Sequence, residues 1–599
     1  MQSRIAFALV ALSVLLHWPF GQPDFVYDDV DLVLENASLR SFGGTFEAMI
    51  EPFPPDQPER GLYRPIATLS HAVDFAVFEF EPDGHHIVNV VLYGALVWLV
   101  YALARAWFGD ASPTAVAAAL LFAVHPVHCD AVDTVSGRSE VLALVFVVSS
   151  ILLFLRASPP GDERPRRGIG AASGLLYLLG CGTKETAVLL PAVLVLHLLA
   201  RDGAPGGALA FAKRALDHTS LHLGIACIYL AVRLEVLGGF GPAQPVLEGI
   251  GLLARTSIAG AVFAEYLRLL VWPDVLQLDF YYQQTIGLPG TPTLQSVVGW
   301  VAALALLLGW TTAAVAALRG RPTSLASPRG LWIAGLGSAC VFLLPVSHLL
   351  DIGALMAERF LFAPSLGFVL FATGLASHFL QRHVADHRTR RLVAVVAVAG
   401  LAVAGGLRSG LRAAEWRDGI QLWESLSRLT PGDYRTYSNA ATHWIARGDY
   451  EAAERALRTA LTLETGDPAV HTNLAVVLME RGELAAAESI HRVLLETNPA
   501  DVHAWHSLGV IELRRERVAQ ALTYFERALV ANPNFEPARR QAEQARKRIE
   551  FARRYIHQNR GRARESEDPD FRSTFQRACK IAGEDCGEQP VPTGSESSP

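Results

Sequence analysis

Ionisable side chains recur next to long apolar runs in the first 370 residues. A carboxylate can accept a proton from an attacking hydroxyl, and a guanidinium or ammonium group can hold a departing phosphate. Because charges are costly in a bilayer, their presence beside apolar runs favours a functional role. These residue types suit the transfer of a group away from an anionic lipid. The candidate site residues are Asp28, Asp29, Tyr63, Arg64, His125, His128, Arg138, Glu140, Lys184, Glu185, Glu358 and Arg359.

Each of these groups also has a structural interpretation. The adjacent acidic pair could cap a helix in a loop. His125 and His128 could be interface histidines with satisfied hydrogen bonds. Their spacing could also hold a metal together with Asp130, provided that a further ligand comes from elsewhere in the chain. The basic and acidic pairs that follow could be anchoring ion pairs, so the sequence alone leaves both interpretations open.

The composition is that of a membrane protein with a soluble part. Hydrophobic residues make up 51% of the 599 residues and charged residues only 18%, and the mean hydropathy is +0.27. Soluble domains carry about 25% charged residues. The net charge is −6, from 52 basic and 58 acidic residues. No basic stripe alternates with aromatic residues, so no nucleic-acid partner is expected.

Apolar runs predict an all-α, polytopic membrane domain over residues 1–407. A helix needs about 20 apolar residues to cross a bilayer. The first run resembles a signal peptide but has a poor cleavage site, so we expect a retained anchor. About eleven spans are predicted, near residues 4–20, 86–107, 114–131, 139–156, 169–183, 186–201, 220–237, 296–318, 331–350, 360–380 and 391–407.

Basic residues predict the orientation of this domain. Lys and Arg favour cytoplasmic loops, and a cytoplasmic N-terminus places all basic loops inside if Gly251–Trp272 does not cross. That stretch carries three charges, so we predict an interfacial or re-entrant helix. The long loop 21–85, with the Asp pair, and everything after residue 408 then lie outside the cytoplasm. The basic loops are near residues 156–167, 201–214, 319–329 and 382–391.

A 34-residue period marks the soluble region, residues 408–558. Small residues recur where two helices would touch, large apolar residues separate the units, and a proline ends them, which is the tetratricopeptide pattern. A capping helix follows the units. The tail, 559–599, is predicted to be disordered from its composition, although Cys579 and Cys586 could pair in an oxidising compartment. The units are 433–466, 467–500 and 501–534.

Several segments, in order along the chain, resemble the transmembrane and tetratricopeptide repeat-containing O-mannosyltransferases. That family belongs to the C-type superfamily of multi-span glycosyltransferases. No single segment is specific, but together they are, and the repeats follow them as in the family. The matching segments are Phe25–Asp29, Tyr63–Pro65, His86–Asn89, Leu121–Glu140, Lys184–Glu185, Leu276–Phe280 and Pro345–Gly367.

This resemblance implies an activity and a site. It implies inverting transfer of mannose from a polyprenyl- or dolichyl-phosphate carrier to a Ser or Thr hydroxyl of a protein, on the lumenal or periplasmic side. The base maps to Asp28, with Asp29 beside it. The Lys-Glu and Glu-Arg motifs map to residues 184–185 and 358–359, for which charge suggests phosphate binding. Tyr63, Arg64 and the segment 125–140 would complete the substrate site.

Some features depart from the family. Cys129 and Asp130 stand where Thr and Glu are more usual, and the repeat array is short. Tight loops rich in Ala and Arg favour a bacterial relative in the inner membrane, with an undecaprenyl carrier and another sugar as alternatives. A eukaryotic relative would lie in the endoplasmic reticulum. We expect no cofactor beyond the lipid-linked donor, and a divalent metal stays open. The expected partners are that donor, an acceptor protein bound by the repeats, and membrane lipid.

Two other functions are compatible with the same organisation. A membrane-anchored repeat scaffold would bind proteins without catalysis, but a pure anchor has no need of charges along one membrane face. A transporter would carry charges at the middle of the bilayer, whereas the charges here lie mainly at one edge. The charge distribution therefore favours the glycosyltransferase, and the scaffold is the main alternative.

Overall fold

The computed structural model describes residues 2–18, 23–55, 57–160, 165–239, 249–278, 282, 286, 293–321, 323–348, 354–464 and 466–586. Within these ranges all regular elements are helices, as the all-α prediction requires. The chain forms two compact units, Met1–Leu422 and Trp423–Pro599. The first extends beyond residue 407, where the apolar run ends, because the polar last turns of helix α17 (His387–Trp416) are also buried in it: Arg412 and Trp416 are 1% and 0% exposed.

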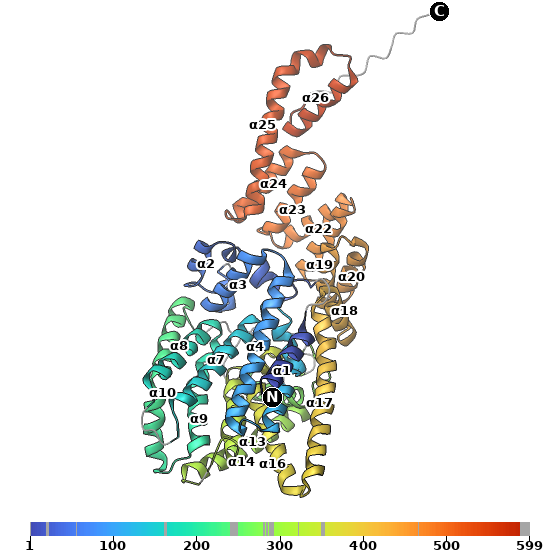
Figure 1. Ribbon diagram of the computed structural model, residues 1–599. Helices are drawn as coiled ribbons and strands as arrows, with labels where there is room; N and C mark the ends of the chain where they lie inside the picture. The colour runs from blue at the N-terminus through green and yellow to red at the C-terminus, as the bar shows by residue number, and fades with distance from the viewer. Residues whose placement is uncertain are drawn as a thin grey trace, which may run out of the picture. The chain divides into compact units, whose positions relative to one another are not determined.

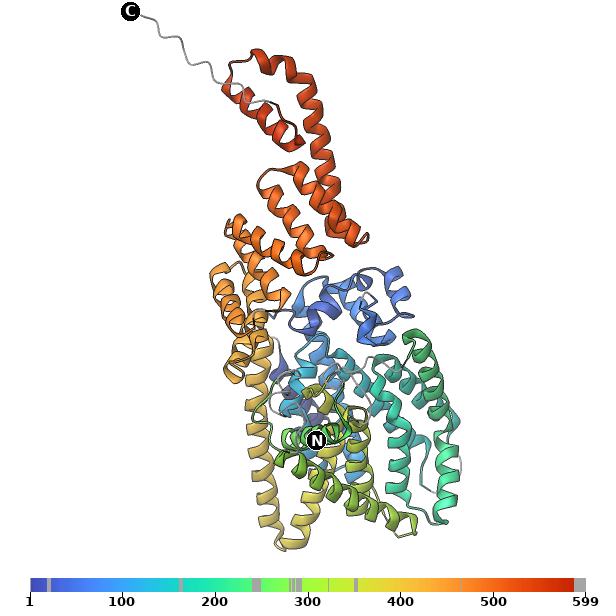
Figure 2. The same ribbon diagram turned by 180° about the vertical axis from the view of Figure 1, so that it is seen from behind.

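The long outer loop predicted at 21–85 is largely helical. Figure 1 shows helices α2 and α3 of this loop at one end of the first unit. The opposite end holds two turns, one between α9 (Leu190–Asp202) and α10 (Gly207–Leu237) and one between α16 (Phe362–His383) and α17. Figure 2 shows the same arrangement from behind. Those two turns carry basic residues predicted to be cytoplasmic. The elements of the loop are η1 (Val30–Leu34), η2 (Ala37–Arg40), α2 (Phe42–Ala48), η3 (Pro58–Arg60) and α3 (Pro65–Phe78).

Apolar helices form the rest of the first unit. They are α1 (Gln2–His17), α4 (Pro82–Phe108), α5 (Pro113–Ala123), η4 (Pro126–His128), α6 (Cys129–Val132), α7 (Arg138–Ala157), α8 (Arg167–Thr183), η5 (Glu185–Leu189), α9 (Leu190–Asp202), α10 (Gly207–Leu237), α11 (Leu252–Val271), α13 (Leu294–Leu318), α14 (Pro328–Gly330), η8 (Leu331–Leu336), α15 (Gly337–Leu343), η9 (Leu344–Val346), η10 (Glu358–Leu361), α16 (Phe362–His383) and α17 (His387–Trp416).

By length and composition, seven helices among the described residues can cross a membrane, or eight if the bent α5–α6 pair is one span. The predicted count of about eleven also includes α1, α8 and α9, which are 16, 17 and 13 residues long. These three are shorter than a typical span of about 20 residues. The stretch predicted not to cross is helix α11, which is not one of the seven.

Two glycines allow α11 and α13 to approach closely. A Cβ atom on Gly299 would lie 1.8 Å from the Gly260 carbonyl oxygen, so neither position tolerates a side chain without a shift of backbone. Small residues at helix crossings are the usual means of close packing in membranes, where packing itself drives association. This contact fixes α11 against the bundle, which matters because α11 lines a cavity described below.

The three predicted repeats are present as helix pairs. The first helix of each begins directly after an aspartate cap, at Asp433, Asp467 and Asp501, whose side chains accept backbone N–H bonds from the first turn. Gly509 packs on the Phe525 ring at a crossing that leaves no room for a Cβ. After α18 (Gly419–Leu429), the pairs are α19 (Tyr434–Ala446) with α20 (Tyr450–Leu463), α21 (Pro468–Glu480) with α22 (Leu484–Thr497), and α23 (Val502–Arg514) with α24 (Val518–Ala531).

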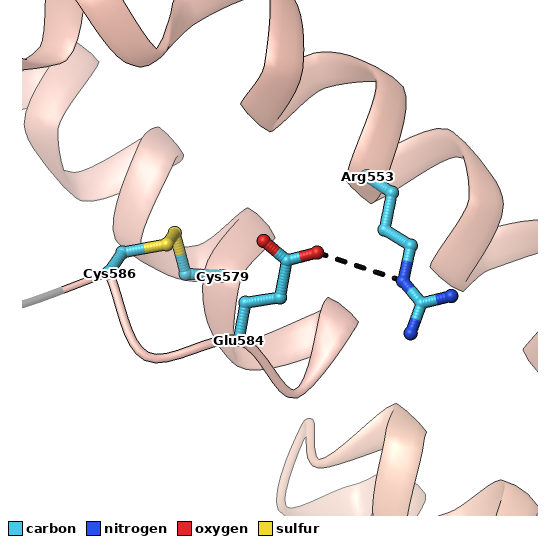
Figure 3. The surroundings of a disulfide bond; sticks show 4 residues. All are labelled: Arg553, Cys579, Glu584 and Cys586. Carbon is cyan, nitrogen blue, oxygen red and sulfur yellow. Dashed lines mark ion pairs between the residues drawn. A yellow bond between two sulfur atoms is a disulfide. The ribbon is translucent and has the colours of Figure 1, made fainter.

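The prediction of disorder from residue 559 onward is wrong as far as residue 586. Helix α25 (Glu536–Glu565) continues beyond the predicted cap, and α26 (Pro569–Ala582) folds back on it. Phe575 and Cys579 of α26 pack in one buried cluster with Ile556 of α25. The polar composition of the segment led to the prediction of disorder, although these few apolar residues suffice for the packing. Figure 3 shows the Cys579–Cys586 disulfide beside the Arg553–Glu584 ion pair. Residues 587–599, and parts of 276–280 and 345–367, lie outside the described residues.

Candidate functional site

The two adjacent aspartates have different environments. Asp29 is fully buried. Its carboxylate accepts backbone N–H bonds from Ser136 (2.7 Å), Val135 (3.1 Å) and Val26 (3.4 Å). Burial raises the pKa of Asp29, against the opposing charge of His86 and these N–H groups. Asp29 therefore connects the first outer loop to the turn before α7. This structural role is an alternative to its predicted catalytic role.

Asp28 instead has a side chain that is 25% exposed. One carboxylate oxygen lies 3.3 Å from Nη1 of Arg60, and the other lies 3.6 Å from Nη2 of Arg359. A carboxylate that reaches solvent and whose two contacts with other described residues are long is available to a substrate. Of the predicted acidic pair, Asp28 is the carboxylate that solvent reaches.

Arg359 is the cation that faces Asp28. Its guanidinium, 18% exposed, lies 3.5 Å from Oδ2 of Asp130, and its backbone N–H donates to the same oxygen at 3.0 Å. Asp130 is 4% exposed, so it acts as a fixed support for this arginine. The structure thus brings together three predicted segments, near residues 28, 130 and 359. It adds Arg60, which no sequence signal indicated, and it gives Asp130 a role other than metal binding.

A second cluster of charges is paired one to one. Arg64 holds Glu185 through two bonds, of 3.1 and 2.9 Å. Lys184 forms an ion pair with Glu140, and both are about 5% exposed. Burial lowers the pKa of Lys184, an effect that the Glu140 charge partly offsets. Burial acts to raise the pKa of Glu185, but Arg64 and Lys184 outweigh it and the net effect is a lowered pKa. These cations are already neutralised by protein carboxylates.

The anchoring ion pairs suggested by sequence neighbours form with other partners. Arg138 does not bind Glu140. It donates to the Asn89 side chain at 2.7 Å and to the His85 carbonyl at 2.8 Å, and it pairs with Asp74. Arg138 is fully buried, so its role is to connect α7 with α3 and α4. Side chains one or two positions apart on a helix point in different directions. Their charges therefore pair with residues of other segments and not with each other.

The HxxH histidines have satisfied rings. His128 Nδ1 lies 2.8 Å from the Tyr93 hydroxyl, and its Nε2 lies 2.8 Å from the Ser365 hydroxyl. His125 Nε2 lies 3.1 Å from the Leu270 carbonyl oxygen. Both histidines therefore fit the interface interpretation, and neither shares a contact with Asp130 among the described residues.

Glu358 does not share the role of its neighbour Arg359. It is fully buried and accepts hydrogen bonds from the Gln277 N–H and, at 3.1 Å, from the Tyr282 hydroxyl. Arg412 of α17 lies 3.7 Å from the same carboxylate. Glu358 thus anchors surrounding segments. Tyr63 is also buried, and its ring stacks on Tyr229 with centroids 6.2 Å apart.

A further buried cluster joins α1 to the bundle. His17, Cys129 and Asp133 bring metal-ligating atoms within 4.8 Å of one another. His17 Nδ1 lies 2.9 and 3.1 Å from the two Asp133 oxygens, and the Cys129 thiol donates to the Ser409 carbonyl at 3.5 Å. Each member has a protein partner, so the contacts account for the cluster as a connection between helices.

An apolar cavity of about 660 Å³ lies within the first unit, lined by residues of α9, α11, α13 and α15 and by the η9 turn. Its walls include Phe263, Trp300, Trp310 and Val341. Tyr266, also in the wall, lies within electrostatic range of Arg359.

Known protein families match the membrane unit and the repeat unit separately. A family model described as dolichyl-phosphate-mannose-protein mannosyltransferase matches residues 64–233. Two tetratricopeptide repeat models match residues 445–509 and 485–536. Protein O-mannosyl-transferase TMTC4 of Homo sapiens is 26% identical over an alignment of 483 residues that covers 72% of this chain and 62% of that protein. The chain is a relative of the transmembrane and tetratricopeptide repeat-containing O-mannosyltransferases.

Other relatives agree with this relationship, which confirms the sequence-based resemblance. Protein O-mannosyl-transferase Tmtc1 of Drosophila melanogaster is 28% identical over 528 residues, covering 75% of this chain and 60% of that protein. Tmtc2 of the same organism is 32% identical over 275 residues, covering 43% and 28%. The chain spans less than two thirds of the length of these relatives. A solved structure titled "Crystal structure of APC/C hetero-tetramer Cut9-Hcn1" matches at a TM-score of 0.21 and 14% identity over 80% of this chain and 89% of that one, too low to support an argument.

Proposed function

We propose that this protein is an integral-membrane glycosyltransferase that moves mannose from a polyprenyl-phosphate carrier to a Ser or Thr hydroxyl of a protein. The observation that supports it is the pairing, at one accessible place, of a carboxylate and a guanidinium, Asp28 and Arg359, drawn from two distant matching segments. Proteins named O-mannosyl-transferases are its relatives. A repeat scaffold without catalysis is the alternative.

In the proposed reaction Asp28 is the base. Its carboxylate takes the proton of the acceptor hydroxyl as the oxygen forms a bond to the anomeric carbon. The bond from that carbon to the phosphate oxygen breaks on the opposite face, so the configuration inverts. The polyprenyl phosphate leaves with the electron pair, and Arg359 stabilises its charge. One base and one stabilised leaving group suffice for this displacement, without a covalent intermediate and without a metal.

The geometry implies that the sugar separates the two groups. In an in-line displacement the base and the cation stand on opposite sides of the anomeric carbon, on the order of 8 Å apart. Asp28 and Arg359 are 3.6 Å apart. We expect the donor to enter between them while Arg60 holds Asp28 and Asp130 holds Arg359. Their ion pair thus keeps both side chains positioned in the absence of donor.

The apolar cavity suits the prenyl chain of the donor. Its volume of about 660 Å³ and its aromatic and aliphatic walls fit several isoprene units, and its wall residue Tyr266 lies within electrostatic range of Arg359. A phosphate beside Arg359 with its chain in this cavity would leave the sugar facing Asp28. Burial of each chain carbon stabilises binding by about 0.8 kcal/mol, which favours a lipid carrier over a soluble nucleotide sugar.

The repeats are proposed to recruit the acceptor protein outside the cytoplasm. A tetratricopeptide array offers an extended surface for polypeptides, and three units of it are present. The Cys579–Cys586 disulfide is the kind of bond that persists in oxidising compartments. We further propose a bacterial inner-membrane protein with its repeats in the periplasm. Labelling of free thiols in intact cells tests this side, since only Cys579 and Cys586 should become reactive after reduction with a membrane-impermeant reagent.

The decisive experiment is transfer by purified protein in detergent, with labelled polyprenyl-phosphate mannose and a Ser/Thr-rich peptide. Product formation by the wild type and its loss in Asp28→Asn supports the proposal. Asp83→Asn, which removes an exposed carboxylate at the start of α4, is the matched control and should retain activity. Absence of transfer from every polyprenyl-phosphate sugar tested, by protein whose repeats still bind the peptide, favours the scaffold.

A further inference from the structure

A second groove lies in the other half of the first unit, between α1, α4, α7 and α8. Its volume is about 520 Å³, and its wall is mainly apolar, with Ala6, Trp98, Leu152 and Leu176 among its residues. At one end it is lined by two arginines, which lie near the C-terminal ends of α4 and α7. Since α7 has 20 residues, this end is roughly 30 Å from the turn that Asp29 caps.

The two arginines give the end of the groove a positive charge. Arg105 is 28% exposed and its partner, Asp110, is a surface carboxylate that is 75% exposed. Such exposed pairs stabilise by less than about 1 kcal/mol and exchange readily. Arg156 is exposed and has no ion pair among the residues that the structure describes. Arg105 thus has one weakly held carboxylate, and Arg156 has none among the described residues.

Two polar side chains complete this end. Gln2 and Ser3 of α1 line the groove beside the arginines, and the Gln2 amide donates to the Asp110 carbonyl at 3.2 Å. The arrangement has a cationic and hydrogen-bonding end followed by an apolar channel. A ligand that fits must have an anionic head and a hydrocarbon tail. The positive-inside distribution of basic residues puts this end at the cytoplasmic leaflet.

We propose that this groove binds an anionic phospholipid, with its phosphate between Arg105 and Arg156 and one acyl chain along Trp98 and Leu152. Basic pockets between membrane helices on the cytoplasmic side hold lipid headgroups in this way. The groove is independent of the transferase site, because no residue lining it contacts Asp28 or Arg359 among the described residues. The bound lipid would hold α1 against α4 and α7.

A polyprenyl phosphate has the same general chemistry, a phosphate on a long hydrocarbon, so the test must separate the two sources. Purified full-length protein is incubated with mixed micelles of phosphatidylglycerol and phosphatidylcholine, and retained lipid is counted by native mass spectrometry. We expect one phosphatidylglycerol per protein. The double variant R105Q/R156Q should retain it about 30-fold less strongly, from two cationic contacts. Arg391→Gln, a basic residue of α17 outside the groove, is the control.

A second variant keeps the charges and fills the channel. Ala6→Phe should also reduce retention, since Ala6 lines the groove. Displacement of phosphatidylglycerol by equimolar polyprenyl phosphate would overturn the proposal and assign the groove to the carrier. Equal retention by R105Q/R156Q and Arg391→Gln, or a preference for phosphatidylcholine, would also overturn it. Because lipid retention is measured without a transfer assay, its outcome is separate from that of the proposed enzyme activity.

Discussion

Two clusters of charge in the first unit use the same residue types in opposite ways. Around Asp28 and Arg359 the side chains are 18–25% exposed, and their mutual distance of 3.6 Å is long for an ion pair. Lys184 and Glu140 are buried and pair with each other, and Arg64 pairs with Glu185, whose side chain is 31% exposed, so each cation has its own carboxylate. The first cluster can exchange a protein partner for a substrate. In the second, a substrate would have to displace a carboxylate from its cation and leave that charge uncompensated, so we expect this cluster to stabilise the fold.

The largest effect is expected from Asp28→Asn. Without a base the acceptor hydroxyl keeps its proton, and the transfer rate should fall at least about 1,000-fold, within the range of a general base. Expression and thermal stability should remain close to wild type, because the two contacts of the Asp28 side chain with other described residues are long. The measurement is product formed per folded protein. Normal transfer by this variant would remove Asp28 from the mechanism.

Glu140→Gln should act on stability instead. It leaves Lys184 buried next to a neutral amide, which destabilises a protein by about 3 kcal/mol or more. A lower thermal unfolding midpoint in detergent is the expected result, with partial recovery in the double variant E140L/K184M. If Glu140→Gln kept wild-type stability but lost transfer, Lys184 would belong with the phosphate-binding group, and the contrast between the clusters would fail.

The Arg64–Glu185 pair predicts a dependence on acid. Because its pKa in the folded protein is below its ordinary value of about 4.5, Glu185 contributes stability at higher pH. That contribution declines as pH falls below about 4.5 toward the lowered pKa. Unfolding midpoints measured between pH 7 and 3 should therefore decline less steeply for Glu185→Gln than for wild type. Parallel curves would mean that the two bonds to Arg64 do not persist in solution.

The smallest effect is expected from Arg60→Gln. Arg60 lies 3.3 Å from Asp28 and 2.5 Å from Asp31 on an accessible surface, where ion pairs stabilise by about 0–1 kcal/mol. Transfer should fall by up to about tenfold through poorer positioning of Asp28, with little change in unfolding. KM and kcat measured for the peptide distinguish two effects of the substitution. Poorer positioning of Asp28 would lower kcat, whereas loss of a contact between Arg60 and the acceptor would change mainly KM.

Sequence reasoning located most segments of the candidate site, but it did not distinguish the environments of the individual residues within it. It selected the segments around residues 28, 130 and 359, because costly charges stand out against apolar runs. It could not separate Asp28 from Asp29, since adjacent residues look alike in a sequence and differ only in what packs around them. Arg60 stayed undetected because a loop arginine between Pro58 and Gly61 carries no periodic signal.

Periodicity is what the amino-acid sequence determined by itself: the apolar runs of the membrane unit, with charges beside them, and the 34-residue repeats. These follow from local physics, the length of a helix and the cost of a charge in hydrocarbon. Only the tertiary structure decided which charges are paired. Lys184 binds Glu140 and not Glu185, and Asp28 faces Arg359, because ion pairs depend on distances between segments that are far apart in the chain.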